Sequence, residues 1–184
     1  MYLPLWLTHE PSTCKAMKTI LIMRHAKSSW SNPYLKDFDR PLNSRGKNDA
    51  PKIGVFLKDK QIIPEKVYCS PAKRTRSTIK KVLKQFNGDD NIVEYAEDLY
   101  FRGSEAYLSA LTSTPSDIKT VMTVGHNPMT EEFISMLSST PVIAPVKTAT
   151  LACLTAGVEN WSDLKPGSCT LQWIIGPKEL PKKQ

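Results

Sequence analysis

The sequence predicts an α/β fold, a three-layer α/β/α sandwich whose sheet is mostly parallel and has an antiparallel edge. Two observations lead to this prediction. Apolar runs rich in β-branched residues alternate with segments of helical period, which is the pattern of β-α units around a parallel sheet. The last two apolar runs are separated by only a turn-rich connector, which favours an antiparallel pair. A chain of 184 residues has the size of one such domain.

Strong helix start signals place two helices between the expected strands. Ser70-Pro71 predicts a helix reaching about residue 86, because serine is a good N-cap and proline fits the first helical position. Asn127-Pro128 repeats this arrangement and predicts a helix that ends near Leu137. The runs expected to form strands are 19–23, 67–69, 92–95, 120–124, 149–154 and 170–175.

Two further helices are expected from weaker signals. Ser104 is predicted to cap a helix that continues to Leu111. Asn43 or Ser44 is predicted to open a helix ending at Lys58, in which Pro51 introduces a kink or a later start.

The two ends of the chain are expected to lie outside the folded domain. Residues 1–16 lack the basic start and the sustained apolar core of a secretory signal, and Met17 directly precedes the first strand. We therefore predict a disordered extension over 1–16, a domain over 17–177 and a flexible tail over 178–184.

The net charge of +7 allows three interpretations: attraction of anionic substrates, nucleic-acid binding, or ordinary solubility. The densest basic cluster, Lys80, Lys81 and Lys84, falls on a predicted helix, and no aromatic residues alternate with basic ones. We therefore expect no nucleic-acid partner. Since no apolar run reaches the roughly 18 residues needed to cross a bilayer, a soluble protein without a membrane partner is expected.

The four cysteines, Cys14, Cys69, Cys153 and Cys169, include no C-x-x-C pair. This spacing predicts buried thiols in a reducing compartment and hence a cytoplasmic protein. A phosphatase of the cysteine-dependent type needs five residues between its cysteine and arginine. Four residues separate Cys69 from Arg74 and six separate it from Arg76, so that chemistry is disfavoured.

Three predicted strand-to-helix junctions carry residues suited to binding an anion. The first strand ends in Arg24-His25, the second leads to Arg74, and the strand over 120–124 leads to His126. In open α/β sheets, ligands bind beyond the carboxyl ends of the strands, where helix amino ends favour anions. We therefore expect two histidines and two arginines to converge on one phosphate.

These junctions resemble the motifs of the histidine phosphatase, or phosphoglycerate-mutase-like, superfamily, and are most similar to its small SixA-type phosphohistidine phosphatases. The similarity extends over about residues 18–177. The first motif has Ala26 where glycine is usual, so the prediction requires a negative φ at this position. The four motifs are Met23-Arg24-His25-Ala26, Arg40-Pro41-Leu42-Asn43-Ser44-Arg45-Gly46, Ser70-Pro71-Ala72-Lys73-Arg74 and Val124-Gly125-His126-Asn127-Pro128.

The resemblance implies a role for each of four residues. His25 matches the nucleophile that forms a phosphohistidine intermediate, which water then hydrolyses. Arg24 and Arg74 match the arginines that clamp the phosphoryl oxygens. His126 matches the second histidine of the pocket, which donates a hydrogen bond to the transferring group. Because arginines neutralise the charge, neither a metal nor another cofactor is expected.

The proton donor is assigned first to Asp98, which lies nearest the position of the corresponding family acid. Glu97, Glu131 and Glu132 are the other candidates. The expected substrate is a phosphorylated small molecule or a protein that bears phosphohistidine. A phosphoramidate has a leaving nitrogen that protonates easily, so phosphohistidine depends less on a strong acid than an alkyl phosphate does.

Four residues that follow the nucleophile in the sequence are candidates for substrate binding. Lys27, Ser28 and Asn32 either contact the substrate or serve the turn chemistry of their loop. Arg40 reaches the pocket rim or braces the loop before the next helix, and bracing is favoured.

Three other functions compete with phosphate hydrolysis. A sugar-phosphate mutase on the same scaffold needs capping insertions that exclude water, for which this chain has little length. A catalytically silent phosphate-binding module would keep the arginines but form no covalent intermediate. A basic nucleic-acid binder would lose affinity steeply with salt and would tolerate the loss of His25.

Overall fold

One mixed sheet organises residues 17–142 and 144–180, which are the part of the chain that the computed structural model describes. The order of its six strands is β3-β2-β4-β1-β5-β6. Pairing is parallel from β3 to β1, while β5 is antiparallel to β1 and β6 is antiparallel to β5. The predicted sheet is confirmed, with strands β1 (Lys18–Arg24), β2 (Lys66–Cys69), β3 (Val93–Tyr95), β4 (Thr120–Gly125), β5 (Leu151–Ala156) and β6 (Cys169–Ile175).

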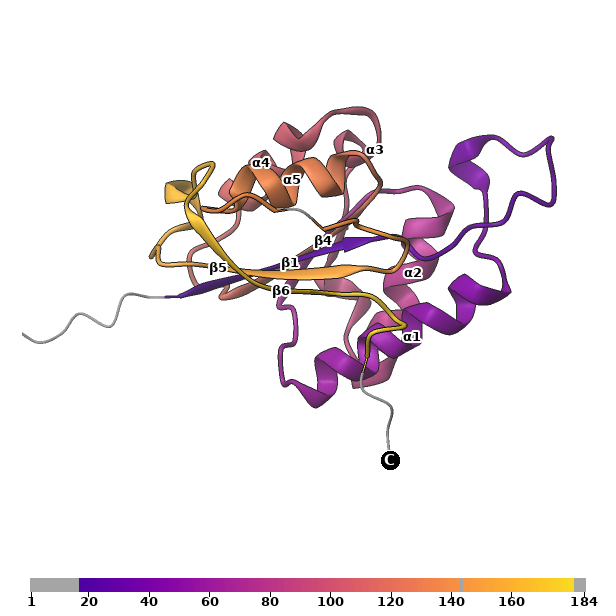
Figure 1. The fold of residues 1–184 in the computed structure, drawn as a ribbon, viewed down its shortest axis with the longest axis horizontal. Helices are drawn as coiled ribbons and strands as arrows, with labels where there is room; N and C mark the ends of the chain where they lie inside the picture. The colour runs from indigo at the N-terminus through magenta and orange to yellow at the C-terminus, as the bar shows by residue number, and fades with distance from the viewer. Residues whose placement is uncertain (1–16, 143, 181–184) are drawn as a thin grey trace, which may run out of the picture.

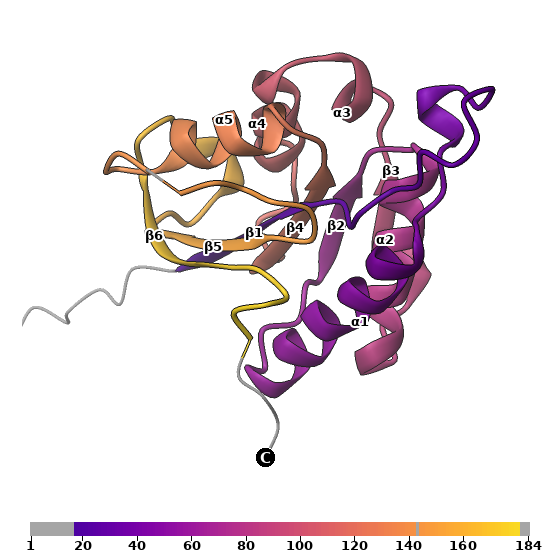
Figure 2. The same ribbon diagram turned by 45° about the vertical axis from the view of Figure 1, so that its right-hand side comes forward.

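Helices cover both faces of the sheet, because its central strand is apolar on both sides. Ile20 and Ile22 of β1 pack into one core, and Leu21 and Met23 pack into the other. In Figures 1 and 2, α4 and α5 lie above the sheet and α1 and α2 lie below it. The helices are α1 (Ser44–Asp59), α2 (Lys73–Leu83), α3 (Asp98–Phe101), α4 (Ser104–Thr112) and α5 (Met129–Leu137).

The helix starts agree only in part with their predicted caps. The side chain of Asn43 caps α1 by accepting a hydrogen bond from the Gly46 amide at 2.9 Å, and Pro51 lies inside this helix without ending it. The predicted cap at Ser104 is wrong: this serine is the first residue of α4, and the capping position belongs to Gly103, which has no side chain to contribute.

The predicted cap of α2 is also wrong. The helix begins three residues after Ser70, at Lys73, and its capping residue Ala72 has no side chain that can accept a hydrogen bond. The Ser70 hydroxyl lies instead 2.8 Å from a ring nitrogen of His126, so a tertiary contact takes the place of the local cap. The strand-to-helix connection remains short, as expected.

The expected extension over 1–16 lies outside the described residues and stays a prediction. Of the expected tail, residues 178–180 are described: the Glu179 carboxylate accepts a hydrogen bond from the Gly176 amide at 2.6 Å, and Leu180 packs against the core beneath the sheet. Within 17–142 and 144–180, no helix has the length and apolar character needed to span a membrane.

Candidate active site

The candidate site lies where three neighbouring parallel strands end. His25 follows β1, His126 follows β4, and Ser70 follows β2 and leads into α2. The His25 amide donates to the carbonyl of Gly125 at 3.0 Å, so the two histidine-bearing turns lie side by side. The two imidazole rings are 5.1 Å apart between their centroids.

Arg74 lies between the two histidines. Its Nε is 3.3 Å from Nε2 of His25 and 3.2 Å from Nδ1 of His126. The guanidinium comes from the first turn of α2 and is only 7% exposed. The structure therefore brings together three of the four residues expected around one anion, and it points the strongest hydrogen-bond donor of the group at both rings.

The hydrogen bond of His25 determines which of its nitrogens is available for reaction. Nδ1 lies 2.8 Å from the Ala26 carbonyl oxygen, which can only accept, so the neutral ring carries its proton on Nδ1. Nε2 then keeps its lone pair and faces Arg74. Burial lowers the pKa of His25 to about 4, and the charges of Arg74 and Arg24 act in the same direction. At neutral pH the ring is therefore uncharged.

His126 is held by contacts on both of its nitrogens. Since Nδ1 accepts from Arg74, the neutral ring carries its proton on Nε2 and donates it to the Ser70 hydroxyl. The ring of Tyr100 packs edge-on at 5.3 Å between centroids. Burial, followed by the charge of Arg74, lowers the pKa of His126 to about 3.

Arg24 contributes a second guanidinium to the same pocket. Its Nη1 donates to the carbonyl of Val146 at 2.8 Å, which anchors the side chain to the segment before β5. Its Nε is buried and has no hydrogen-bond partner among the described residues. A buried N–H without a partner is costly, so an anion that accepts from Arg24 would remove an existing penalty.

The pocket around these residues has a volume of about 160 Å³. Of the expected substrate-binding residues, Lys27, Ser28 and Arg40 line it, whereas Asn32 does not. The side chain of Asn32 accepts from the amide of Tyr34 at 3.0 Å, which is local turn chemistry. The full lining consists of Arg24, His25, Lys27, Ser28, Trp30, Arg40, Arg74, His126, Asn127 and Thr148.

Arg40 both braces its loop and borders the pocket. Its Nη2 donates to the Ser28 hydroxyl at 2.7 Å, its Nε donates to the Ser29 carbonyl at 3.0 Å, and its Nη1 pairs with Asp37 at 2.7 Å. The exposed ring of Trp30 covers the guanidinium, with 3.2 Å between the guanidinium carbon and the centroid of the ring. These contacts fix the loop between β1 and α1 over the pocket.

Alanine fits at position 26 because the backbone there does not require glycine. Positive φ angles at non-glycine residues occur in the described chain only at Gln61, Asn87 and Ala149. Ala26 is fully buried, and its amide donates to the Thr78 hydroxyl at 3.0 Å. A close approach that does require glycine occurs at Gly46, where a Cβ would lie 2.2 Å from the Lys27 carbonyl oxygen.

The structure does not bring Asp98 to the pocket. This aspartate starts α3, and its exposed carboxylate pairs with Arg102 one turn later at 3.1 Å. It lines a different groove, next to α4. From α3 it is Tyr100 that reaches the site, because its ring lies on the inner face of this short helix. The assignment of Asp98 as proton donor is therefore corrected.

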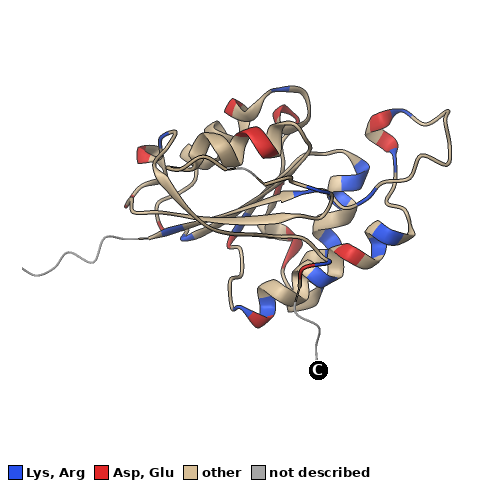
Figure 3. Ribbon diagram, in the orientation of Figure 1, with Lys and Arg blue, Asp and Glu red and all other residues tan. Residues whose placement is uncertain are grey.

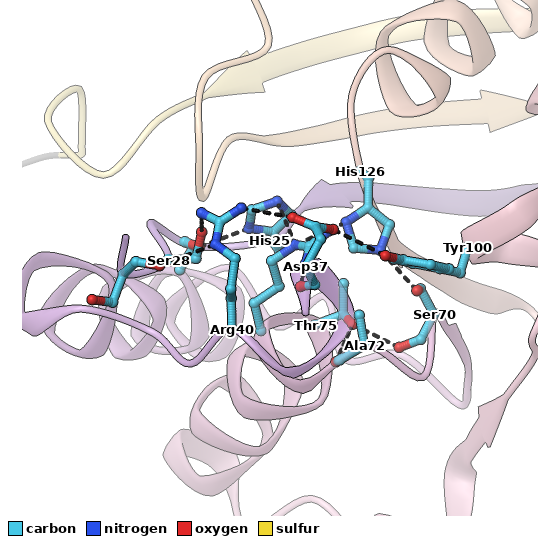
Figure 4. A network of polar contacts seen from close by, with 12 residues as sticks. His25, Ser28, Asp37, Arg40, Ser70, Ala72, Thr75, Tyr100 and His126 are labelled. Atoms are coloured by element: carbon cyan, nitrogen blue, oxygen red, sulfur yellow. Dashed lines mark hydrogen bonds and ion pairs between the residues drawn. The ribbon is translucent and has the colours of Figure 1, made fainter. Parts of the chain in front are cut away.

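Asp37 is a carboxylate in direct contact with two arginines of the site, and sequence reasoning missed it. It accepts from Nη2 of Arg74 at 2.8 Å. It also accepts from the Tyr100 hydroxyl at 2.9 Å and from Arg40 (Figure 4). Hydrogen bonds from Tyr100 and Arg40 and the charge of Arg74 outweigh burial and hold the pKa of Asp37 below its usual value. Its position three residues before Arg40 was the one available sequence signal.

The described residues can also be compared with a metal centre and with a cysteine-dependent site. These residues contain no group of three or more His, Cys, Asp or Glu side chains arranged to hold a metal ion. Cys69, Cys153 and Cys169 are buried free thiols, as expected, and Cys14 lies outside the described residues. Burial raises the pKa of Cys69 far above its usual value, which opposes a thiolate nucleophile.

Comparison with known proteins identifies the class of this fold and site. The sequence profile of the histidine phosphatase superfamily (branch 1) matches residues 20–101. An uncharacterized chloroplastic protein of Arabidopsis thaliana is 34% identical over 184 aligned residues, which cover 91% of this chain and 81% of the relative. The solved structure of a protein assigned to the SixA phosphohistidine phosphatases, from Nakamurella multipartitia, has a TM-score of 0.73 and 28% identity, with 88% of this chain and 96% of that chain covered.

The chain therefore belongs to the histidine phosphatase superfamily, and its similarity to SixA-type proteins is confirmed. A shorter match exists to a 2,3-bisphosphoglycerate-dependent phosphoglycerate mutase of Elusimicrobium minutum, 35% identical over 75 residues that cover 40% of this chain and 30% of the mutase. Membership supports phosphatase- or mutase-type activity.

Proposed function

We propose that this protein is a metal-independent phosphatase that hydrolyses phosphohistidine or small phosphomonoesters through a covalent intermediate on His25. The observation that carries the proposal is the position of Arg74 Nε, which lies within 3.3 Å of a nitrogen of each histidine. A tetrahedral anion bound next to this atom would contact a nucleophile, a second imidazole and a guanidinium at once.

In the first step, the lone pair on His25 Nε2 attacks phosphorus in line with the leaving group. A phosphorus–nitrogen bond forms at Nε2 while the bond to the leaving nitrogen or oxygen breaks, and the leaving group takes up a proton. The Ala26 carbonyl, 2.8 Å from Nδ1, stabilises the positive charge that develops on the ring. In the second step, the oxygen of a water molecule forms a bond to phosphorus while the phosphorus–nitrogen bond at Nε2 breaks. Inorganic phosphate leaves, a proton of the water passes to phosphate or solvent, and His25 is regenerated with its lone pair on Nε2.

Arg24 and Arg74 stabilise the charge on the equatorial oxygens in both steps. Phosphoryl transfer depends mainly on positioning and on preorganised positive groups, and these two guanidinium groups supply them without a metal. Burial lowers the pKa of His126, and the negative charge of the bound phosphoryl group raises it again. Protonated His126 can then donate from Nδ1 to a phosphoryl oxygen.

The acid–base character of the pocket favours phosphohistidine over alkyl phosphates. Its lining contains no carboxylic acid. The neighbouring Asp37 is paired with two arginines, which keep it ionised and make it a poor proton donor at neutral pH. A leaving imidazole protonates easily, whereas a leaving alkoxide needs a strong acid close by.

Comparison of the wild-type protein with His25→Ala tests the mechanism on an aryl phosphate and on a phosphohistidine peptide. Turnover of both substrates should fall by at least about 10³-fold, because the two-step route is lost. The wild type should show an acid-labile, base-stable phosphate label on His25, and EDTA should leave its activity intact. Near-normal turnover by the variant would end the proposal, and EDTA inhibition reversed by a divalent ion would contradict metal independence.

The mutase match supports a second candidate, transfer of the phosphoryl group to an acceptor instead of water. Hydrolysis is preferred because a single connection, between β1 and α1, covers the pocket, and Trp30 is exposed at the rim of the pocket. Release of phosphate in the presence of 3-phosphoglycerate, without phosphorylated acceptor, separates the two. A silent phosphate-binding module would form no labelled intermediate. A cytoplasmic location is proposed with the function.

A further inference from the structure

A second cavity adjoins the candidate active site on the outer side of α2. Its volume is about 350 Å³. It shares no lining residue with the catalytic pocket, and its polar lining is dominated by three cations. We call it the basic cavity; it is lined by Phe38, Asp39, Pro71, Lys73, Arg76, Ser77 and Lys80.

The three cations share one exposed face of α2. Lys73, Arg76 and Lys80 follow the spacing i, i+3, i+7, which aligns them along a helix, and all three are exposed. None of them forms an ion pair with a described residue, although Asp39 borders the same cavity. Arg76 lies over the ring of Tyr95, 5.0 Å from its centroid, which holds its guanidinium without neutralising it.

Local helix energetics do not explain these charges. The amino end of a helix is stabilised by acidic side chains and destabilised by basic ones, yet the first turn of α2 contains no acidic residue. The proposed role of Arg74 in the active site accounts for one of the cations in this turn. Lys73 and Arg76 remain as cations placed against the helix dipole without a carboxylate partner among the described residues.

The two helical layers also differ in charge. The helices α3, α4 and α5 contain the carboxylates Asp98, Glu105, Glu131 and Glu132 and no lysine or arginine. In the other layer, α2 contains only cations among its charged residues, and α1 contains four cations and two aspartates. Figure 3 shows this separation as acidic segments above the sheet and mainly basic segments below it. An acidic partner would therefore be attracted to the side of the molecule that carries the basic cavity.

The basic cavity and the catalytic pocket are separated by one turn of chain. Phe38 and Asp39 belong to η1 (Asp37–Asp39), whose first residue contacts Arg74, and Lys73 directly precedes Arg74 in α2. A pocket of about 160 Å³ holds little more than a phosphoryl group and its leaving ring. The remainder of a protein substrate must then lie on the neighbouring surface.

We infer that the basic cavity binds carboxylates of an acidic segment next to the phosphorylated histidine of a protein substrate. This inference rests on the proposed function and names the chemistry of its partner. Long, flexible, exposed lysines suit several solvated carboxylates. Phe38 and Pro71 add an apolar edge against which the peptide backbone can pack.

Two phosphohistidine peptides test the inference: one with three glutamates beside the phosphohistidine, the other with three glutamines at the same positions. The wild type should hydrolyse the glutamate peptide with a kcat/KM about fivefold to tenfold higher, and 0.5 M salt should remove this preference, because exposed charge pairs are modest and screened. The double variant Lys73→Glu/Lys80→Glu should lose the preference or reverse it, while its turnover of an aryl phosphate stays within about threefold of wild type.

The matched control is Lys58→Glu/Lys119→Glu, which makes the same change in net charge at exposed lysines outside both cavities. It should keep the preference for the glutamate peptide. Thermal unfolding should place the Lys73→Glu/Lys80→Glu variant close to the wild-type Tm, since glutamate is favoured at position 73 in the first turn of α2 and disfavoured at position 80 in its last turn. This result would show that its loss of preference does not come from misfolding.

Three results would overturn the inference. Equal kcat/KM for the two peptides in the wild type would show that flanking carboxylates are not recognised. An equal loss of preference in the control would assign the effect to net charge instead of the cavity. Turnover of the aryl phosphate without turnover of either peptide would exclude the substrate class. Absence of turnover on every substrate would contradict the proposed function itself.

Discussion

Asp37 holds two edges of the Arg74 guanidinium: its carboxylate accepts from Nη2 at 2.8 Å and its backbone carbonyl accepts from Nη1. Only Nε of this guanidinium is left facing the two histidines. The Asp37 side chain is 51% exposed, so the pair lies at the boundary between the buried guanidinium and solvent. A carboxylate thus occupies donors that a phosphoryl group could also use.

Replacement of this carboxylate should strengthen anion binding. In Asp37→Asn, the negative charge that competes for Arg74 is removed while a side-chain oxygen remains. We expect the inhibition constant of inorganic phosphate, measured against an aryl phosphate, to fall by about threefold to tenfold. Asp98→Asn serves as the control and should change it by less than twofold. Weaker phosphate binding in Asp37→Asn would indicate that the carboxylate mainly positions Arg74.

Arg74 should not be replaceable by lysine. A lysine ammonium cannot contact both histidines and Asp37 in the fixed directions that the guanidinium provides. Arg74→Lys should lower kcat/KM by about 10²-fold or more with little change in Tm. Arg76→Lys, two residues along the same helix but facing outward, should keep nearly full activity on an aryl phosphate. Comparable losses in both variants would contradict the central position given to Arg74.

Thr78 is predicted to position the backbone after the nucleophile. Its buried hydroxyl accepts from the Ala26 amide at 3.0 Å and donates to the Arg74 carbonyl at 2.7 Å. Thr78→Val keeps the shape but leaves the Ala26 amide without a partner, which should cost about 1–3 kcal/mol of unfolding free energy. Thr112→Val, at a half-buried position, should cost much less. Denaturant unfolding of the two variants measures the difference.

The buried histidines make stability depend on pH in a defined direction. Both pKa values lie below the ordinary 6.5, at about 4 for His25 and about 3 for His126. Between these values and 6.5 the unfolded chain binds more protons, so the free energy of unfolding should fall as pH falls. Each histidine should contribute about 2–3 kcal/mol of this loss between pH 7 and 4.5.

Chemical denaturation at pH 7 and pH 4.5 checks this dependence. His25→Gln and His126→Gln should each show a smaller loss than the wild type over this interval, because one titrating group is removed. A loss as large as that of the wild type in both variants would assign the pH dependence to other groups. The lowered pKa of Asp37 makes stability fall in a separate and lower pH range, as pH drops below the usual pKa of a carboxyl group.

Short-range patterns were sufficient to predict the fold. Alternating apolar residues of β1 pack into two different cores, so a strand covered on both faces follows from its composition alone. The predicted caps at Ser70 and Ser104 were wrong because they rested on a local signal alone. A serine next to a helix is a local preference of about 1 kcal/mol, and a single tertiary hydrogen bond such as that from His126 to Ser70 can override it.

The carboxylate near the site could not be identified in the same way. Asp98 was chosen by its position after a strand, but its side chain turns along α3 toward Arg102. Asp37 comes from the long connection between β1 and α1, where no periodicity indicates the direction of a side chain. Its contacts with Arg74 and Tyr100 join segments 37 and 63 residues away.

The amino-acid sequence by itself determined the order of strands and helices, the placing of His25 and His126 at strand ends and the placing of Arg74 at a helix start, because these depend on apolar period and on residues next to turns. Only the tertiary structure decided that Asp37 and Tyr100 enclose Arg74, that Asn32 and Asp98 lie away from the pocket, and that a separate basic cavity adjoins it. Side-chain directions in loops and in first helical turns are set by packing between distant segments, which no local pattern encodes.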